Sequence, residues 1–95
     1  MNQCKNLEEV RSNIDRLDDQ IIQLIAERGK YVLQASVFKK TEESVKDPSR
    51  VEKVIQKVRT KATQYGASPD MIEALYRKMI SMFVEIEMKE YKSKL

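Results

Sequence analysis

Residues 7–38 read LEEVRSNIDRLDDQIIQLIAERGKYVLQASVF, and this stretch decides the fold. Apolar residues recur at alternating intervals of three and four, which predicts one long helix with a single apolar stripe. We expect this helix to run from about Leu7 to about Lys40 and to be roughly 50 Å long. A small domain cannot cover such a helix along its whole length, so a second copy of the chain is expected to bury the rest, as a homodimer. The stripe consists of Leu7, Val10, Ile14, Leu17, Ile21, Leu24, Arg28, Tyr31, Ala35 and Phe38.

The composition fits one small all-α domain. The chain has 95 residues, of which 41% are hydrophobic and 35% are charged, with a net charge of +3. We expect a single domain at residues 1–95, with residues 1–6 as an N-terminal tail. Acids are interspersed with the cations, so no nucleic-acid partner is expected. We find no secretory signal and no apolar run of transmembrane length, and the single Cys4 forms no intrachain disulfide. We therefore expect no membrane partner and a cytoplasmic location.

Two further helices are predicted after a polar connection at residues 41–46. Asp47 is a suitable N-cap for the second helix, and Pro48 suits its first position. Gly66 is placed to end that helix in the left-handed conformation. Ser68, which is followed by proline, begins the third helix. The apolar residues of the second helix are Val51, Val54, Ile55, Val58 and Ala62, and those of the third are Ile72, Leu75, Tyr76, Met79, Ile80 and Phe83.

Arg28 interrupts the apolar stripe of the first helix. A guanidinium stays protonated, so its burial requires an anionic partner, which is either an acid from another helix or an anionic ligand. Lys39 follows eleven residues later, close to three helical turns, which places it on the same face with Val32 and Ala35 in between. Such a face can bind a dianion. The alternative is that both cations reach solvent or pair with acids.

Glu87 lies on the apolar stripe of the third helix, four residues after Phe83. A carboxyl group there is either paired with a buried cation, such as Arg28 or Lys39, or protonated because burial disfavours its charge. In the second case it can donate a hydrogen bond to a ligand oxygen. Arg11 points roughly 80–100° away from the Arg28 face, so it does not readily share an Arg28 site within one chain, but it can reach such a site from a second subunit. Otherwise it is a surface arginine that pairs with a nearby acid.

Some kinds of chemistry are excluded by the residues that the chain lacks. It has no histidine and one cysteine, so it has no imidazole acid–base pair, no Ser-His-Asp triad and no thiolate zinc site. Its two glycines, Gly29 and Gly66, cannot build a phosphate-binding loop. We expect no metal and no cofactor. If the chain is an enzyme, it acts by positioning a substrate and stabilising charge.

Together these residues resemble the all-helical chorismate mutases. The resemblance covers about residues 7–91 and depends on LEEVRSNIDRLD at residues 7–18, IAER at residues 25–28 and Lys39. It implies a three-helix subunit whose long first helix pairs with its twin, so that an intertwined homodimer encloses two active sites. It also implies the cofactor-free, pericyclic rearrangement of chorismate, a small dicarboxylate, to prephenate in aromatic amino-acid biosynthesis.

The resemblance also implies roles for individual residues. Arg28 and Lys39 match the cations that hold the carboxylates and the ether oxygen of the substrate. Arg11 matches the arginine that the opposite subunit contributes. Arg50 matches the arginine that opens the second helix, and Asp47 matches a nearby acidic position in a loop of the site.

Glu87 falls where many family members have a glutamine that faces the ether oxygen, and some members have glutamate. A glutamate must be protonated to donate that hydrogen bond, which implies better activity at lower pH. The residues expected to line the pocket are Val32, Ala35, Val51 and Phe83.

One departure from typical mutases lies directly after Arg50. Typical mutases have a glutamate there that binds the substrate hydroxyl, whereas this chain has Val51. QASVFK at residues 34–39, PSRV at residues 48–51 and the aromatic Phe83 resemble the isochorismate-pyruvate lyase branch, which makes salicylate on the same scaffold. The lyase reaction is therefore the alternative to the mutase reaction. A non-catalytic dimerisation or regulatory module is a third interpretation, but such a module has no need for ionisable groups such as Arg28 within its apolar stripes.

Overall fold

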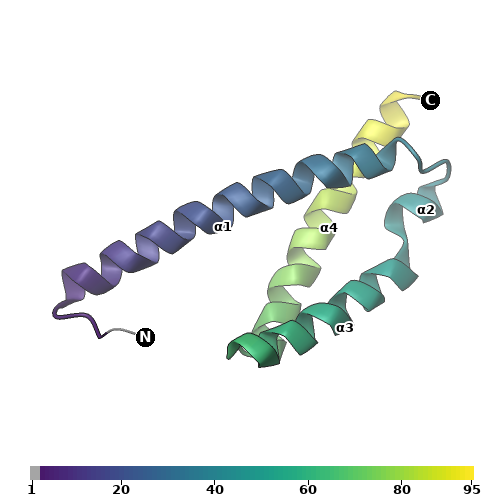
Figure 1. The fold of residues 1–95 in the computed structure, drawn as a ribbon. Coiled ribbons are helices and arrows are strands. Elements are labelled where there is room, and N and C mark those ends of the chain that lie inside the picture. The colour runs from purple at the N-terminus through teal and green to yellow at the C-terminus, as the bar shows by residue number, and fades with distance from the viewer. Residues whose placement is uncertain (1–2) are drawn as a thin grey trace. The chain divides into compact units, whose positions relative to one another are not determined.

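The computed structural model describes residues 3–95, which contain four helices and no strand. The helices are α1 (Leu7–Ser36), α2 (Glu42–Lys46), α3 (Pro48–Tyr65) and α4 (Pro69–Ser93) (Figure 1). The all-α prediction, with a long first helix and two later ones, is confirmed. Of the tail predicted at residues 1–6, residues 1–2 lie outside the described part. The chain divides into two compact units, residues 1–31 and residues 32–95.

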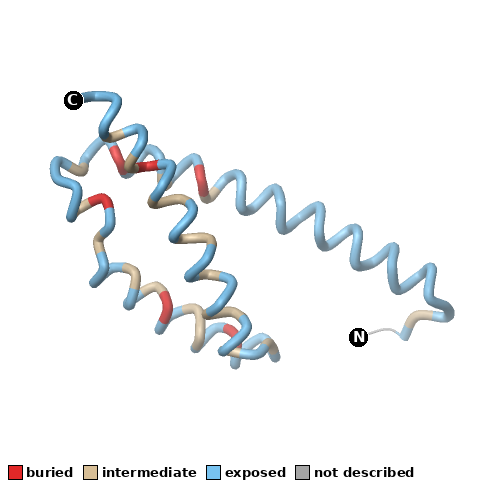
Figure 2. Tube along the Cα trace, turned by 180° about the vertical axis from the view of Figure 1, so that it is seen from behind, coloured by how far each residue is buried: buried red, intermediate tan, exposed pale blue. Residues whose placement is uncertain are grey.

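Most of α1 makes up the first unit. The helix begins after Asn6, whose side-chain oxygen accepts a hydrogen bond from the Glu9 backbone N–H at 2.8 Å. Glu8 and Glu9 in the first turn interact favourably with the helix dipole. Most residues of this helix are exposed in the single chain (Figure 2), and they include most of its apolar residues. We call Leu7, Val10, Ile14, Leu17, Ile21 and Leu24 the α1 stripe, and each of these residues is at least 38% exposed.

The first helix ends at Ser36, so the prediction that it continues to about Lys40 is wrong. The Ser36 hydroxyl donates a hydrogen bond to the Leu33 carbonyl at 2.6 Å. The backbone N–H groups of residues 37–39 donate to carbonyls three residues earlier. Such bonds tighten the last turn and end the α-helix. Phe38, which was expected on the apolar stripe, lies beyond the helix and is 82% exposed.

The polar connection predicted at residues 41–46 contains the short helix α2. Thr41 and Ser44 form a capping box, in which each side-chain oxygen accepts a hydrogen bond from the other residue's backbone N–H, at 3.0 and 3.1 Å. Val45 is 1% exposed, and α2 packs against α4. The sequence does carry a signal for this helix, because threonine is followed by two acids and then by Lys46 in the last turn.

The predicted caps of the two later helices are confirmed. The Asp47 carboxylate accepts a hydrogen bond from the Arg50 backbone N–H at 3.4 Å at the start of α3. Gly66 ends that helix with a φ of 77°, in the left-handed region. The Ser68 hydroxyl oxygen accepts from the Met71 backbone N–H at 3.2 Å at the start of α4. The turn at Gly66 lets α3 and α4 form a helical hairpin (Figure 1).

The core of the second unit is small. Its buried apolar residues are Val45, Ile55 and Ala62, of which the last two were predicted on the apolar face of their helix. Part of the apolar surface of α4 stays exposed, including Leu75, which was predicted to face the core. We call Met71, Leu75, Met82 and Ile86 the α4 stripe, because their spacing puts them on one face and each is 48–58% exposed.

A network of five charged side chains links α3 to α4. Arg77 donates two hydrogen bonds to Glu52, each 2.9 Å long, and one to Glu73 at 2.7 Å. Arg59 donates to Asp70 at 3.0 Å and to Glu73 at 2.8 Å. The hydrogen bonds from Arg77 hold the pKa of Glu52 and that of Glu73 below their ordinary value. The network therefore joins the two arms of the hairpin through exposed and half-buried charges.

Replacing Arg77 with methionine should make the free energy of unfolding depend less on pH in the acid range. The lowered pKa values of Glu52 and Glu73 contribute stability that is present above their ordinary value of 4.5 and is lost as the pH falls through the folded-state values. We expect a lower free energy of unfolding than that of the wild type at pH 7, measured with urea, and a difference that shrinks as the pH falls below 4.5. Lys78→Met, which removes the neighbouring exposed cation, is the control. A difference that stays constant with pH would contradict this role of the two acids.

Candidate active site

An ion pair between Lys39 and Glu87 forms the centre of the candidate site. Lys39 lies beyond the end of α1, and Glu87 lies on α4, yet the Lys39 Nζ is 2.9 Å from the Glu87 Oε2. The Glu87 side chain is 4% exposed and the Lys39 side chain is 23% exposed. The sequence left two cations open as partners of this acid, and the structure shows the contact with Lys39.

The pair is asymmetric in its access to solvent. A buried carboxylate without a partner costs several kcal/mol, so Glu87 requires a cation next to it. Lys39 supplies this cation while part of its own side chain stays accessible. An ammonium group has three donors, so Lys39 can contact an anionic ligand and Glu87 together. The arrangement is suited to bind an anion beside a buried carboxyl group.

Asp47 and Arg50 lie at the junction of α2 and α3. Asp47 has a φ of 39° and ends α2 while it caps α3. Its carboxylate also accepts a hydrogen bond from the Ser49 hydroxyl at 3.5 Å. Arg50 is exposed in the first turn of α3, and Val51 is half-buried. The structure thus gives Asp47 a capping role, and its role in substrate binding stays a prediction.

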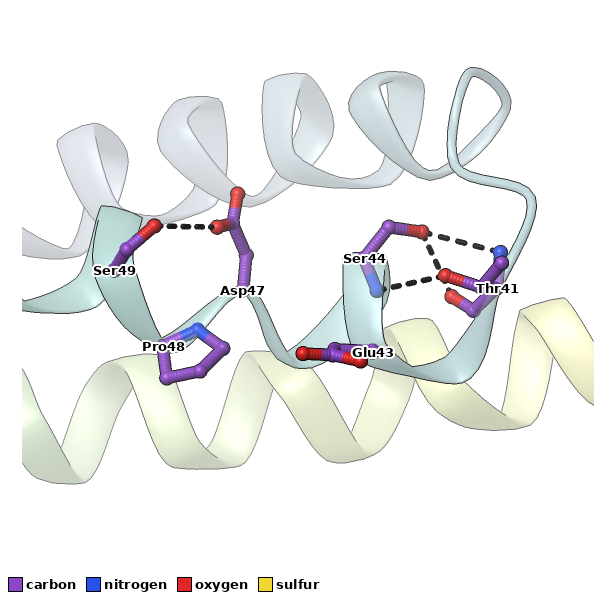
Figure 3. Close-up of a pocket in the computed structure, with 6 residues that line it drawn as sticks. All are labelled: Thr41, Glu43, Ser44, Asp47, Pro48 and Ser49. Carbon is purple, nitrogen blue, oxygen red and sulfur yellow. Dashed lines mark hydrogen bonds between the residues drawn. The ribbon is translucent and has the colours of Figure 1, made fainter.

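A pocket of about 360 Å³ lies at the same junction (Figure 3). Glu43 and Asp47 line it, together with the hydroxyls of Thr41 and Ser44, which bond to each other's backbone in the capping box. No cation lines this pocket. Acidic walls repel a dicarboxylate, so this pocket is not the predicted dianion site. Its lining residues are Thr41, Glu43, Ser44, Asp47, Pro48 and Ser49.

Arg11 and Arg28 lie on α1 in the first unit, Arg11 exposed and Arg28 half-buried. The prediction that Arg28 and Lys39 lie on one helical face is wrong, because α1 ends three residues before Lys39 and its helical spacing does not extend to that residue. Among the predicted charged residues, the structure brings together Lys39 and Glu87. The convergence of both arginines on this pair stays a prediction.

The sequence model described as "Chorismate mutase type II" matches residues 10–88. The chain belongs to the type II chorismate mutase family. It is also similar to a protein of Pseudomonas aeruginosa that is described as isochorismate pyruvate lyase. The two are 29% identical over 89 residues, which cover 94% of this chain and 88% of that protein. The family resemblance noted in the sequence is thereby confirmed.

Every residue predicted for the site lies within the range that matches the type II chorismate mutase family. The predicted lining residues differ in burial, since Val32, Val51 and Phe83 are half-buried and Ala35 is exposed. Across residues 3–95 we find no group of three or more acidic, histidine or cysteine residues that could hold a metal ion. In the same residues, no helix combines the length and the apolar character needed to cross a bilayer.

Two contacts next to Lys39 were not predicted from the sequence of this family member. The Tyr91 hydroxyl donates a hydrogen bond to the Lys40 carbonyl oxygen at 3.1 Å. The Lys92 Nζ lies 3.8 Å from the Glu42 Oε1. Tyr91 follows Glu87 by one helical turn, and that spacing is the signal that could have associated it with the site.

Proposed function

We propose that this chain catalyses the pericyclic rearrangement of chorismate to prephenate. The observation that carries the proposal is the ion pair of Lys39 with Glu87, in which a lysine with a partly accessible side chain lies beside a buried acid. Chorismate carries two carboxylates and an enol ether. In the rearrangement the ether C–O bond breaks while a C–C bond forms, and negative charge develops on the ether oxygen. A fixed cation next to that oxygen stabilises the transition state.

The roles proposed for the charged residues follow from this chemistry. Lys39 and protonated Glu87 donate hydrogen bonds to the ether oxygen. Arg28 binds a carboxylate, with Arg11 from the partner subunit and Arg50 as further cations. Without substrate, Glu87 is the partner of Lys39. The carboxylates of a bound substrate compensate the cations, which favours the protonated form of Glu87 in the complex.

We further propose that the active form is a homodimer. The α1 stripe and the α4 stripe are both exposed in the single chain. Most of α1 forms a unit by itself, so this helix gains stability by burying its apolar stripe. A second copy of the chain offers a matching stripe. In this arrangement Arg11 acts in trans.

A second candidate reaction is the cleavage of isochorismate to salicylate and pyruvate. Val51 favours it, because typical mutases have a glutamate for the chorismate hydroxyl at this position. The similarity to a protein described as isochorismate pyruvate lyase supports it further. A non-catalytic dimerisation module is disfavoured, because such a module gains nothing from the buried carboxyl group of Glu87.

Incubating the purified protein with each substrate separately tests the proposal. We expect prephenate from chorismate at a higher kcat/KM than salicylate and pyruvate from isochorismate. Lys39→Met should abolish turnover, whereas Lys40→Met, which removes the exposed neighbouring cation, should leave it near the wild-type level. Circular dichroism checks that both variants fold. Faster formation of salicylate would favour the lyase reaction, and a folded wild type that converts neither substrate would contradict both reactions.

Mixing two inactive variants should show whether Arg11 acts in trans. Arg11→Ala and Arg28→Ala should each lose roughly 100-fold in kcat/KM, because a buried partner of a carboxylate is worth about 3 kcal/mol. After subunit exchange, about half of the dimers are mixed, and one site in each mixed dimer has both arginines. We therefore expect recovery of about one quarter of wild-type activity. If Arg11 acts in cis, verified exchange will restore nothing, and a stable active monomer in sedimentation would contradict the dimer itself.

Replacing Glu87 with glutamine should remove the dependence of the catalytic rate on pH. The wild-type kcat, which reports ionisation in the complex with substrate, should fall as the pH rises, because ionised Glu87 repels the charge that forms on the ether oxygen. An amide donates at every pH, so the Glu87→Gln profile should be flat and should lie above the wild type at the alkaline end. Glu85→Gln, an exposed acid on the same helix, should keep the wild-type profile. A wild-type profile that is already flat would remove the proposed role of Glu87.

A further inference from the structure

We propose that Tyr91 is a positioning residue that fixes Lys39 in the active site. This inference rests on the proposed function, in which Lys39 stabilises the charge on the ether oxygen. The Tyr91 hydroxyl donates a hydrogen bond to the carbonyl oxygen of Lys40 at 3.1 Å. One peptide bond joins Lys40 to Lys39, so a contact that fixes this carbonyl also restricts the backbone from which the Lys39 side chain extends.

Two successive turns of α4 hold two consecutive residues of the segment after α1. Glu87 and Tyr91 are four residues apart, so they lie on the same face of the helix. Glu87 binds the Lys39 side chain at 2.9 Å, and Tyr91 binds the main chain of Lys40. Lys92 adds a longer contact to Glu42 at 3.8 Å between two exposed side chains, which contributes little.

Lys39 needs such support because it does not lie on a helix. The segment between Ser36 and Glu42 connects α1 to α2. Its start is bonded to the last turn of α1, since the Lys39 backbone N–H donates to the Ser36 carbonyl at 3.2 Å. Its end is fixed by the capping box at Thr41. Groups on loops are placed less accurately than groups on helices, and a flexible lysine amplifies any movement of its backbone. Tyr91 supplies the contact between these two fixed ends.

Tyr91→Phe tests this role because it removes the hydroxyl and keeps the ring. Its matched control is Tyr65→Phe, which makes the same change at a side chain that is 81% exposed at the end of α3. We expect faster amide hydrogen exchange at residues 37–41 and a shifted NMR signal of the Lys39 Nζ in Tyr91→Phe, with neither change in the control. Exchange and NMR signals identical to the wild type would overturn the proposal.

Steady-state kinetics with the preferred substrate distinguish positioning from general stabilisation. Lys39 acts on charge that forms in the transition state, so Tyr91→Phe should lower kcat by roughly 3- to 10-fold while KM changes less than about twofold. An unchanged kcat beside faster exchange would overturn the proposal, because Lys39 would then not depend on Tyr91. If the wild type converts neither substrate, the proposed function fails separately, and the exchange and NMR comparisons still decide whether Tyr91 fixes Lys39.

Discussion

The carboxyl group of Glu87 is almost fully buried on α4, and the arrangement of the second unit around it depends on its neutralisation by Lys39. The contact fixes the segment that leaves α1 against a helix 48 residues later in the sequence. The buried Val45 of α2 packs the following residues onto the same unit. An ion pair in such a position is often no more stable than two apolar side chains of the same volume. The ion pair of Lys39 and Glu87 is therefore better explained by a need for charge at this position than by a contribution to the stability of the fold.

The small core leaves apolar stripes exposed, and covering them by dimer formation would also complete the proposed active site. In the single chain, Ile55 and Ala62 are buried on α3, whereas the α1 stripe and the α4 stripe remain exposed. A chain of 95 residues is near the small end of the domains that fold around one hydrophobic core. If a second copy covers these stripes, the helix that carries Arg11 and Arg28 is placed by the same association that stabilises the fold. Folding, assembly and substrate binding then depend on one interface.

The parts of the structure that local sequence determines could be predicted. Asp47, Gly66 and Ser68 were identified as caps because a cap depends on one side chain or one φ angle and on the adjacent turn. The position of Glu87 on an apolar helical face followed from periodicity, and its burial agrees with that. The end of α1 could not be found in this way, because Ser36 and the bonds after it override a hydrophobic pattern that continues to residue 38.

Which cation meets Glu87 also could not be predicted, because tertiary packing decides it. This outcome bears on the chemistry that we propose. A pericyclic reaction needs no nucleophile, so the protein contributes by holding the substrate and placing charge. Had Lys39 continued α1, the backbone of that helix would have placed its ammonium group. In the observed fold, Lys39 lies beyond the helix, and contacts from α4 hold it: Glu87 at its side chain and Tyr91 at the next carbonyl. The position of the charge is therefore set by α4, although the residue that carries the charge follows α1.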